Sequence, residues 1–309
     1  MPLALDMPSD RNVGHMSKHL DWERDGADWP NRLASRFVVA AGFRWHVQTM
    51  GSGPGLLLLH GTGSSTHSFA ELMPLLARHF TVITPDLPGH AFTGMSRRAD
   101  VSLTGMALAT AELLDVLAFR PAIVVGHSAG AAVLARMCLD RRIAPRVLVS
   151  LNGALLPFGG LAGRVFSPLA RLVVRAPLVP GLIARRGADR AAVARLLANT
   201  GSQLPDRQID IYTRLFANQA HVRATLDMMA QWDLVGLSRD LPALTIPLVL
   251  VAAGNDDAVR PETAFEVEER VPTARVCYVR GLGHLAHEEK PDEIAGLILD
   301  EARSAGLVE

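Results

Sequence analysis

The pentapeptide Gly126-His127-Ser128-Ala129-Gly130 joins two runs of opposite character. Residues 121–125 are apolar and β-branched, which is typical of a buried strand, whereas residues 129–139 are rich in alanine, which favours a helix. A G-x-S-x-G sequence at such a junction predicts a sharp strand-to-helix turn that holds its serine in a strained backbone conformation. Because strand and helix approach each other closely there, only small residues fit beside Ser128.

This turn brings a hydroxyl and a backbone donor together. It lifts the Ser128 side chain above the sheet, where a base can reach it, and it points the Ala129 N–H at the space of a developing oxyanion. Taken alone, the pattern also fits an ordinary tight turn in a chain rich in alanine and glycine. Its meaning therefore depends on what the rest of the chain brings to the same edge.

Strand-like and helix-like runs alternate over most of the chain. The apolar run at 56–59 predicts a strand buried on both faces, which ends in a glycine-bearing loop at 60–65. The same reasoning predicts a hairpin of strands at 36–40 and 43–50, further strands at 80–84, 146–151, 247–253 and 274–279, and helices at 66–79, 102–117, 262–271 and 291–305. The order predicts an α/β fold with a mostly parallel, doubly wound sheet.

The alternation is interrupted once. We expect an irregular N-terminal arm at 1–34, pinned by Trp22 and Trp29, and a core made of 35–152 and 242–309. Residues 153–241 show helical periodicity broken by prolines and no buried strand, which predicts a helical cap over the edge of the sheet where α/β proteins place their ligands.

The predicted cap is rich in arginine. Between Leu155 and Ala198 there are seven arginines and one acid, Asp189, among apolar residues. Amphipathic helices with a solvated arginine face explain this composition. The alternative is an apolar pocket with a basic rim, suited to a large flat acid or to an anionic membrane surface, and it makes Arg185 and Arg186 candidate substrate-binding residues.

Composition narrows the class of protein. A chain of 309 residues, 49% of them hydrophobic, can bury a large core, and its 31 basic and 31 acidic residues give no net field for nucleic acid. The only cysteines, Cys138 and Cys277, fall in a predicted helix and a predicted strand, where we expect small hydrophobic residues rather than a disulfide. With no leader-like segment and no apolar run of about eighteen residues, a cytoplasmic location is expected, with peripheral membrane contact left open.

A serine hydroxyl needs a base and a carboxylate that orients the base. Both follow predicted strands: Asp257 lies in the G-x-x-D-x-V-x-P segment with Asp256 as its rival, and His284 lies between glycines with His287 as its rival. Parallel strands end at one edge of a sheet, so Ser128, Asp257 and His284 are predicted to meet there as a triad.

Other chemistry fits the sequence less well. A metal site at His284-x-x-His287-Glu288 lacks a third ligand, and the loop at 60–65 lacks the G-x-x-x-x-G-K-[ST] of a phosphate-binding loop. That loop instead supplies a second oxyanion donor, the N–H of Thr62 or of Gly63. His60, His90 and His127 are expected to hold loops or pack near the turn. No cofactor is expected.

Together these segments resemble the α/β-hydrolase superfamily over residues 36–305. The resemblance rests on the motifs beginning at His60, Asp86, Gly126, Gly254 and Gly283, in that order. It implies a nucleophilic Ser128, a general base at His284, Asp257 as the orienting acid, and an oxyanion hole formed by the N–H groups of Thr62 and Ala129. The chain departs from the pattern at Ala91 and Thr93, where members carry glycine and serine, which puts the geometry of that loop in doubt.

Within the superfamily, the runs at 28–32, 35–37, 44–48, 59–63 and 65–68 resemble the magnesium-chelatase accessory proteins of bacteriochlorophyll biosynthesis. This resemblance implies an apolar substrate such as a porphyrin and magnesium chelatase as a partner. Three functions follow as hypotheses: hydrolysis of an ester or related acyl bond, another nucleophilic reaction such as carbon–carbon bond hydrolysis, and a non-catalytic accessory that binds porphyrin or the chelatase.

Overall fold

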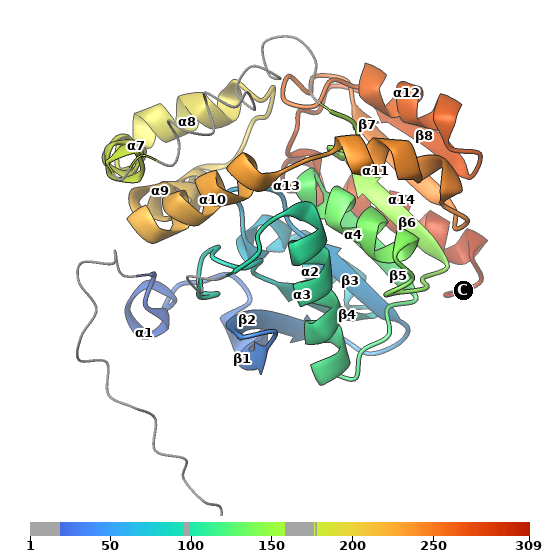
Figure 1. Ribbon diagram of the computed structural model, residues 1–309, viewed down its shortest axis with the longest axis horizontal. Helices are drawn as coiled ribbons and strands as arrows, with labels where there is room; N and C mark the ends of the chain where they lie inside the picture. Colours follow the sequence, from blue (N-terminus) through green and yellow to red (C-terminus); the bar gives the residue numbers. More distant parts are fainter. Residues whose placement is uncertain (1–18, 96–98, 158–175, 177) are drawn as a thin grey trace, which may run out of the picture.

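The computed structural model describes residues 19–95, 99–157, 176 and 178–309. Its centre is an eight-stranded sheet with the order β1-β2-β4-β3-β5-β6-β7-β8 (Figure 1). Strands β3 to β8 run parallel, and the β1–β2 hairpin joins β4 by an antiparallel pairing. The strands are Ser35–Ala40, Phe43–Met50, Gly55–Leu59, Thr81–Pro85, Ile123–His127, Val147–Leu151, Leu248–Ala253 and Ala274–Val279. The predicted α/β fold with a mostly parallel sheet is confirmed.

Alternation along the strands divides the core into two faces. Leu57, Leu59 and Val124 pack on one face, against α3 (Leu103–Val116), α4 (Ala129–Leu139) and α12 (Glu262–Arg270). Leu56 and Leu58 pack on the other face, against α2 (Leu72–Leu76) and α14 (Pro291–Ser304). Because both faces are covered, the central strands read as continuous apolar runs rather than as alternating ones.

One predicted helix is shorter than the sequence pattern suggests. The helix expected at 66–79 divides into a 3-10 turn, η2 (Thr66–Phe69), and the short helix α2. Pro74 is the cause, because a proline lacks an N–H and fits an α-helix only in its first turn, so α2 begins just before it. The Ser65 hydroxyl accepts from the His67 N–H and begins η2.

Among the residues that the structure describes, five helices lie between β6 and β7, which are neighbours in the sheet. They are α7 (Val179–Gly187), α8 (Arg190–Ala198), α9 (Asp206–Ala217), α10 (Gln219–Gln231) and α11 (Val235–Asp240). Figure 1 shows α7 to α10 grouped beside the sheet and α11 above α4. Residues 158–175 and 177 of the predicted cap lie outside the described residues, and the division into arm, core and cap remains a prediction.

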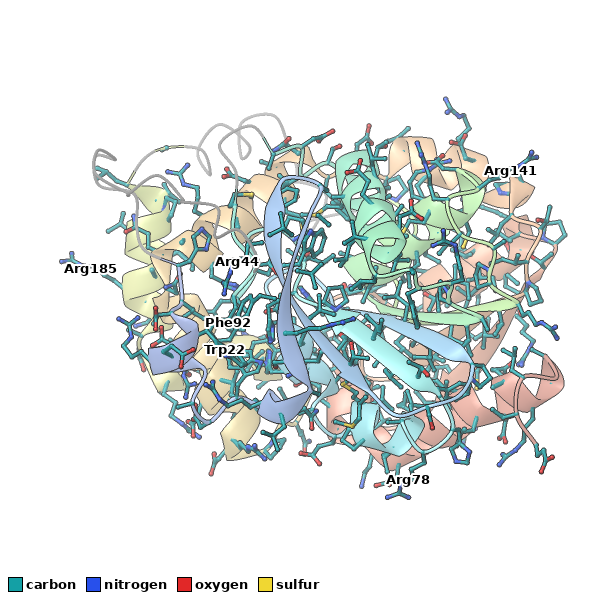
Figure 2. The ribbon with its side chains drawn as sticks, turned by 90° about the horizontal axis from the view of Figure 1, so that it is seen from below. Trp22, Arg44, Arg78, Phe92, Arg141 and Arg185 are labelled. Carbon is teal, nitrogen blue, oxygen red and sulfur yellow. The ribbon has the colours of Figure 1, made fainter. Side chains whose placement is uncertain are left out.

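Two tryptophans hold the described part of the N-terminal arm to the body. Trp22, in α1 (Trp22–Asp25), meets the Phe92 ring edge-on with 4.9 Å between the ring centroids (Figure 2). Trp29 is buried, and its Nε1 donates to Thr66 Oγ1 over 3.1 Å. The expected pinning is therefore confirmed for residues 19–34, and residues 1–18 of the arm lie outside the described residues.

Both cysteines are free thiols in the elements predicted for them, Cys138 in α4 and Cys277 in β8, although each is only partly buried. None of the helices in the described ranges combines the length and the apolar character needed to cross a membrane.

Candidate active site

Ser128 occupies the sharp turn between β5 and α4 that the sequence predicts. Its φ of 51° and ψ of −115° lie in a region that costs a non-glycine residue roughly 1–3 kcal/mol. Small residues permit the turn, since a Cβ on Gly126 would collide with the Ala131 backbone and one on Gly130 with the Leu59 carbonyl. Strain at one polar residue, enforced by packing on both sides, is a hallmark of a functional position.

Backbone bonds tie this turn to neighbouring segments. The Ser128 N–H donates to the Leu151 carbonyl at the end of β6, and the Ser128 carbonyl accepts from the N–H of Ala154. On the other side, a Cβ built on Gly61 would lie 3.0 Å from Ser128 Cβ. The loop that follows β3 therefore lies directly against the serine.

Thr62 and Ala129 lie on either side of this contact. In the described part of the chain, neither backbone N–H donates to a protein acceptor. Ala129 is the first residue of α4, where N–H groups have no partner inside the helix. The two N–H groups are therefore available to an oxygen atom brought near Ser128.

The carboxylate that contacts His284 is Asp256, and the prediction of Asp257 is wrong in this respect. His284 Nδ1 lies 2.8 Å from Asp256 Oδ2, and Asp256 is only 3% exposed. Asp256 points inward because its Oδ1 accepts from the backbone N–H groups of Ala258 and Val259, each over 2.8 Å. Asp257, one residue further along this tight turn, is exposed.

Asn152 also contacts this carboxylate, and sequence reasoning missed it. Its Nδ2 donates to Asp256 Oδ2 over 2.7 Å, and its own backbone has a positive φ of 48°. Asn152 directly follows β6, between the strands that carry Ser128 and Asp256. Its position at the carboxyl end of a predicted central strand was the one feature of the sequence that could have indicated a role in the site.

His284 is 9% exposed and is held through its backbone and its ring. Its N–H donates to the Thr200 carbonyl, which belongs to the segment after α8, and its carbonyl accepts from His127 Nε2 over 3.0 Å. Within the described ranges, the Ser128 hydroxyl makes no hydrogen bond to His284. Such bonds are often long in unliganded enzymes and tighten when substrate binds.

The rival histidine, His287, is held by Ser68 through its Nε2, and its Nδ1 has no hydrogen-bond partner among the described residues. Its Nε2 lies 2.6 Å from Ser68 Oγ, and burial lowers the pKa of its ring to about 3. Ser68 and Tyr212 both donate to Glu288 Oε1, and burial raises the pKa of that carboxyl to about 8. A ring that stays neutral and bonded to Ser68 does not supply the base for Ser128.

His60 holds a loop, as predicted. His60 Nε2 accepts from the Leu87 N–H over 2.9 Å, which joins the loop after β3 to the loop after β4. His221, in α10, was not predicted; it accepts from the Ala91 N–H at Nδ1, and its Nε2 lies 3.1 Å from the Gly63 carbonyl. Ala91 has a positive φ of 42°, so the departure from glycine there is accommodated in a strained backbone that His221 holds.

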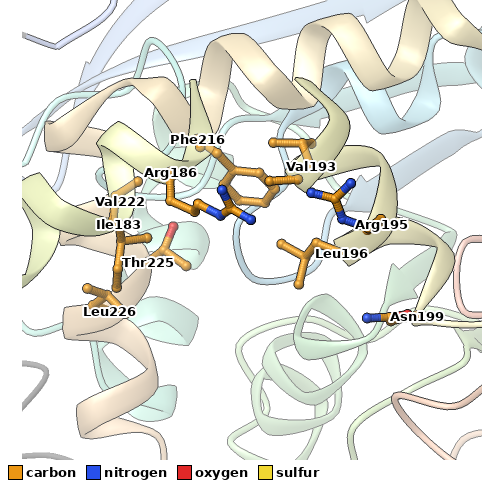
Figure 3. A pocket seen from close by; sticks show the side chains of 12 residues that line it. Ile183, Arg186, Val193, Arg195, Leu196, Asn199, Phe216, Val222, Thr225 and Leu226 are labelled. Carbon is orange, nitrogen blue, oxygen red and sulfur yellow. The ribbon is translucent and has the colours of Figure 1, made fainter. Parts of the chain in front are cut away.

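A cavity of about 450 Å³ lies among α7, α8, α9 and α10 (Figure 3). It adjoins the loop after β3, because a Cβ on Gly63 would lie 3.3 Å from Phe216 Cε1 and 3.4 Å from Thr225 Cγ2, and both residues line the cavity. The expected pair of arginines is divided. Arg186 lines this cavity, whereas Arg185 lines a separate hollow and projects away from the body (Figure 2).

Groups of three or more His, Cys, Asp or Glu side chains suited to a metal ion are absent from the ranges that the structure describes. His284 and His287 engage Asp256 and Ser68, respectively. The arrangement at this edge thus offers a strained serine, a histidine oriented by a buried carboxylate and two free N–H groups, which is the equipment of acyl transfer.

Comparisons with known proteins agree with this fold. The model of the Alpha/beta hydrolase family matches residues 56–297. The chain is 39% identical to the Magnesium-chelatase 30 kDa subunit of Rhodobacter capsulatus, over 89% of this chain and 96% of the relative, and 27% identical to the Pyrrolizixenacetamide deacetylase of Xenorhabdus hominickii, over 80% and 90%. Among solved structures, an alpha/beta hydrolase fold protein from Burkholderia ambifaria superposes with a TM-score of 0.73 at 25% identity, covering 92% of this chain and all of that one.

Proposed function

Because the chain belongs to the α/β-hydrolase family, we propose that it is a serine hydrolase that cleaves an ester or related acyl bond of a bulky apolar substrate. The observation that carries the proposal is the 2.8 Å contact between His284 Nδ1 and the buried Asp256, at the edge where Ser128 is strained. An imidazole with a carboxylate on Nδ1 presents its unprotonated Nε2 as a base.

The proposed reaction uses these groups in order. Ser128 Oγ attacks the acyl carbon while His284 takes the hydroxyl proton, and the N–H groups of Thr62 and Ala129 stabilise the oxyanion. His284 then protonates the leaving group, and a water molecule activated by the same ring releases the acid. Asp256 keeps the Nδ1 proton in place and stabilises the imidazolium. The helices α7 to α10 form the proposed cap over this centre.

Two lines support acyl chemistry. The strained serine and the unbonded N–H groups of Thr62 and Ala129 suit the formation of a tetrahedral intermediate, whereas a protein that only binds a ligand needs neither. The Xenorhabdus hominickii relative is named a deacetylase, and the removal of an acetyl group by water is also an acyl hydrolysis. Carbon–carbon bond hydrolysis on the same residues is the alternative reaction, and a substrate panel separates the two.

The test is labelling of the purified protein with a fluorophosphonate, followed by hydrolysis of 4-nitrophenyl esters. We expect label on Ser128, none on the Ser128→Ala variant, and a loss of activity in that variant of up to about six orders of magnitude, as in a model protease. Asp257→Asn is the matched control, since the exposed Asp257 side chain makes no hydrogen bond to His284 among the described residues, and it should keep both label and activity. Equal turnover by wild type and Ser128→Ala would refute the proposal.

A second candidate function is that of a non-catalytic accessory that binds a porphyrin or magnesium chelatase. The 39% identity to a magnesium-chelatase subunit favours it, as does the lack of a Ser128–His284 hydrogen bond in the described ranges. A Rhodobacter capsulatus strain lacking that relative tests it by complementation. Normal bacteriochlorophyll with Ser128→Ala supports the accessory function, whereas rescue by wild type alone supports a hydrolase needed in the pathway.

A further inference from the structure

We propose that the cavity among α7 to α10 receives an apolar molecule that carries an anionic group, and that Arg195 selects that group. The inference deepens the proposed function, because it names the substrate class of the same site.

The walls of the cavity are apolar. Aliphatic side chains come from α7, α8 and α10, and Phe216 of α9 forms an aromatic surface between them (Figure 3). The aliphatic lining side chains are Ile183, Ala192, Val193, Leu196, Val222 and Leu226. A volume of about 450 Å³ with this lining suits the body of a drug-sized apolar molecule.

The charge in the cavity has one sign. Arg186 and Arg195 line it, their guanidinium groups point toward each other beside Phe216 (Figure 3), and the described residues of the lining include no acidic one. Arg186 is 70% exposed and is engaged by Asp189 over 3.3 Å. Arg195 has no carboxylate partner among the described residues. Its guanidinium can therefore bind the anionic group of a ligand.

Arg195 is exposed, but its side chain is directed toward Phe216 and Arg186, beside Leu196 (Figure 3), whereas Arg185 projects away from the body (Figure 2). Guanidinium groups over apolar and aromatic walls are weakly hydrated and suited to bidentate contact with carboxylate or sulfonate. This arrangement suits a ligand whose apolar body lies inside the cavity and whose acidic group lies beside Arg195.

The cavity also adjoins the loops around the reactive centre. Phe216 and Thr225 lie against Gly63 in the loop that carries the Thr62 N–H. On the other side, the lining residue Asn199 precedes Thr200, whose carbonyl accepts from the His284 N–H. A molecule bound in the cavity therefore lies next to the elements that hold the proposed oxyanion hole and base.

The first test uses the Ser128→Ala protein and two fluorescent probes with the same apolar body, anionic 8-anilinonaphthalene-1-sulfonate and neutral N-phenyl-1-naphthylamine. We expect Arg195→Gln to weaken binding of the anion about tenfold and Arg195→Glu to weaken it further, with the neutral probe changed less than twofold. Arg207→Gln, an exposed arginine of α9 outside the lining, is the matched control and should change neither. Equal effects on both probes, or none on the anion, would overturn the inference.

The second test separates this inference from the proposed function. Wild type and Arg195→Gln are compared on 4-nitrophenyl octanoate and on the mono-4-nitrophenyl ester of suberic acid, which carries a carboxylate at its far end. We expect kcat/KM to fall about tenfold for the suberate ester alone. If Arg195→Gln changes kcat/KM for the two esters by the same factor relative to wild type, the assignment of Arg195 is overturned, but the hydrolase proposal is unaffected. If wild type cleaves neither ester, the hydrolase proposal fails. The two fluorescent probes then still test whether the cavity binds an apolar anion through Arg195.

Discussion

The exchange of Asp256 for asparagine tests the arrangement at its most specific point. Oδ1 of Asp256 accepts from two backbone N–H groups, of Ala258 and Val259, and Oδ2 faces His284 Nδ1 and Asn152 Nδ2. An asparagine keeps both backbone bonds only with its carbonyl oxygen in the place of Oδ1. Its NH₂ group then points at His284.

This orientation sets the expected magnitude. Facing an NH₂ donor, His284 must accept at Nδ1 and carry its proton on Nε2, which is the wrong tautomer for a base. The reverse orientation points the NH₂ group at two N–H groups and loses two hydrogen bonds, each worth about 1 kcal/mol, with further cost for the unsatisfied donors. We therefore expect kcat to fall about 10³- to 10⁴-fold, which corresponds to about 4–5.5 kcal/mol in the activation barrier.

The assay is steady-state hydrolysis of a 4-nitrophenyl ester, with active enzyme counted by fluorophosphonate titration so that misfolded protein is excluded. Asp257→Asn serves as the neighbouring control and should retain kcat within about twofold, because this exposed side chain does not contact His284. A large loss of kcat in Asp257→Asn together with an unchanged kcat in Asp256→Asn would refute the reasoning.

Three further predictions concern residues around this centre. Replacing Asn152 by leucine removes a donor to Asp256, and we expect kcat on the same ester to fall about tenfold with little change in KM; a rise in KM alone would contradict a positioning role. Gly130→Ala drives a methyl group against the Leu59 carbonyl, so urea denaturation should show a loss of about 3 kcal/mol in unfolding free energy, and an unchanged midpoint would contradict the close approach. Burial raises the pKa of Glu288 to about 8 from 4.5, so the folded protein keeps a proton that the unfolded chain has lost, and this contribution to stability is complete below pH 4.5 and disappears as the pH rises toward 8. Between pH 6.5 and 8 the unfolding free energy of wild type should fall by about 2 kcal/mol relative to that of Glu288→Gln, and parallel curves in urea titrations would contradict the assignment.

The turn at Ser128 and the course of the parallel strands were predictable because they depend on local patterns. A β-branched run, small residues and an alanine-rich run leave little choice of backbone, and a continuous apolar run such as that at 56–59 is stable only when both faces of the strand are covered. Strand direction then places the segments after β5, β7 and β8, with Ser128 and His284, at one edge, as the chain alone predicts.

The choice between Asp256 and Asp257 was beyond the sequence. The two carboxylates are adjacent in one turn, and which of them faces the histidine depends on the N–H groups that the folded loop turns inward. The contribution of Asn152 likewise arises because β6 lies between β5 and β7 in the sheet, a neighbourhood that the chain order of motifs does not reveal.

The division of the arginines was decided by packing as well. Composition predicted a basic, apolar set of helices, but Arg185 and Arg186 are successive on α7 and point in different directions, whereas Arg195 reaches the same cavity as Arg186 from α8. Local sequence thus determined the strands, the strained serine and the edge where the site lies, since each depends on short-range sterics and burial. Tertiary structure alone decided which carboxylate contacts His284 and which arginines line the cavity, because side chains from distant segments meet only after the helices pack.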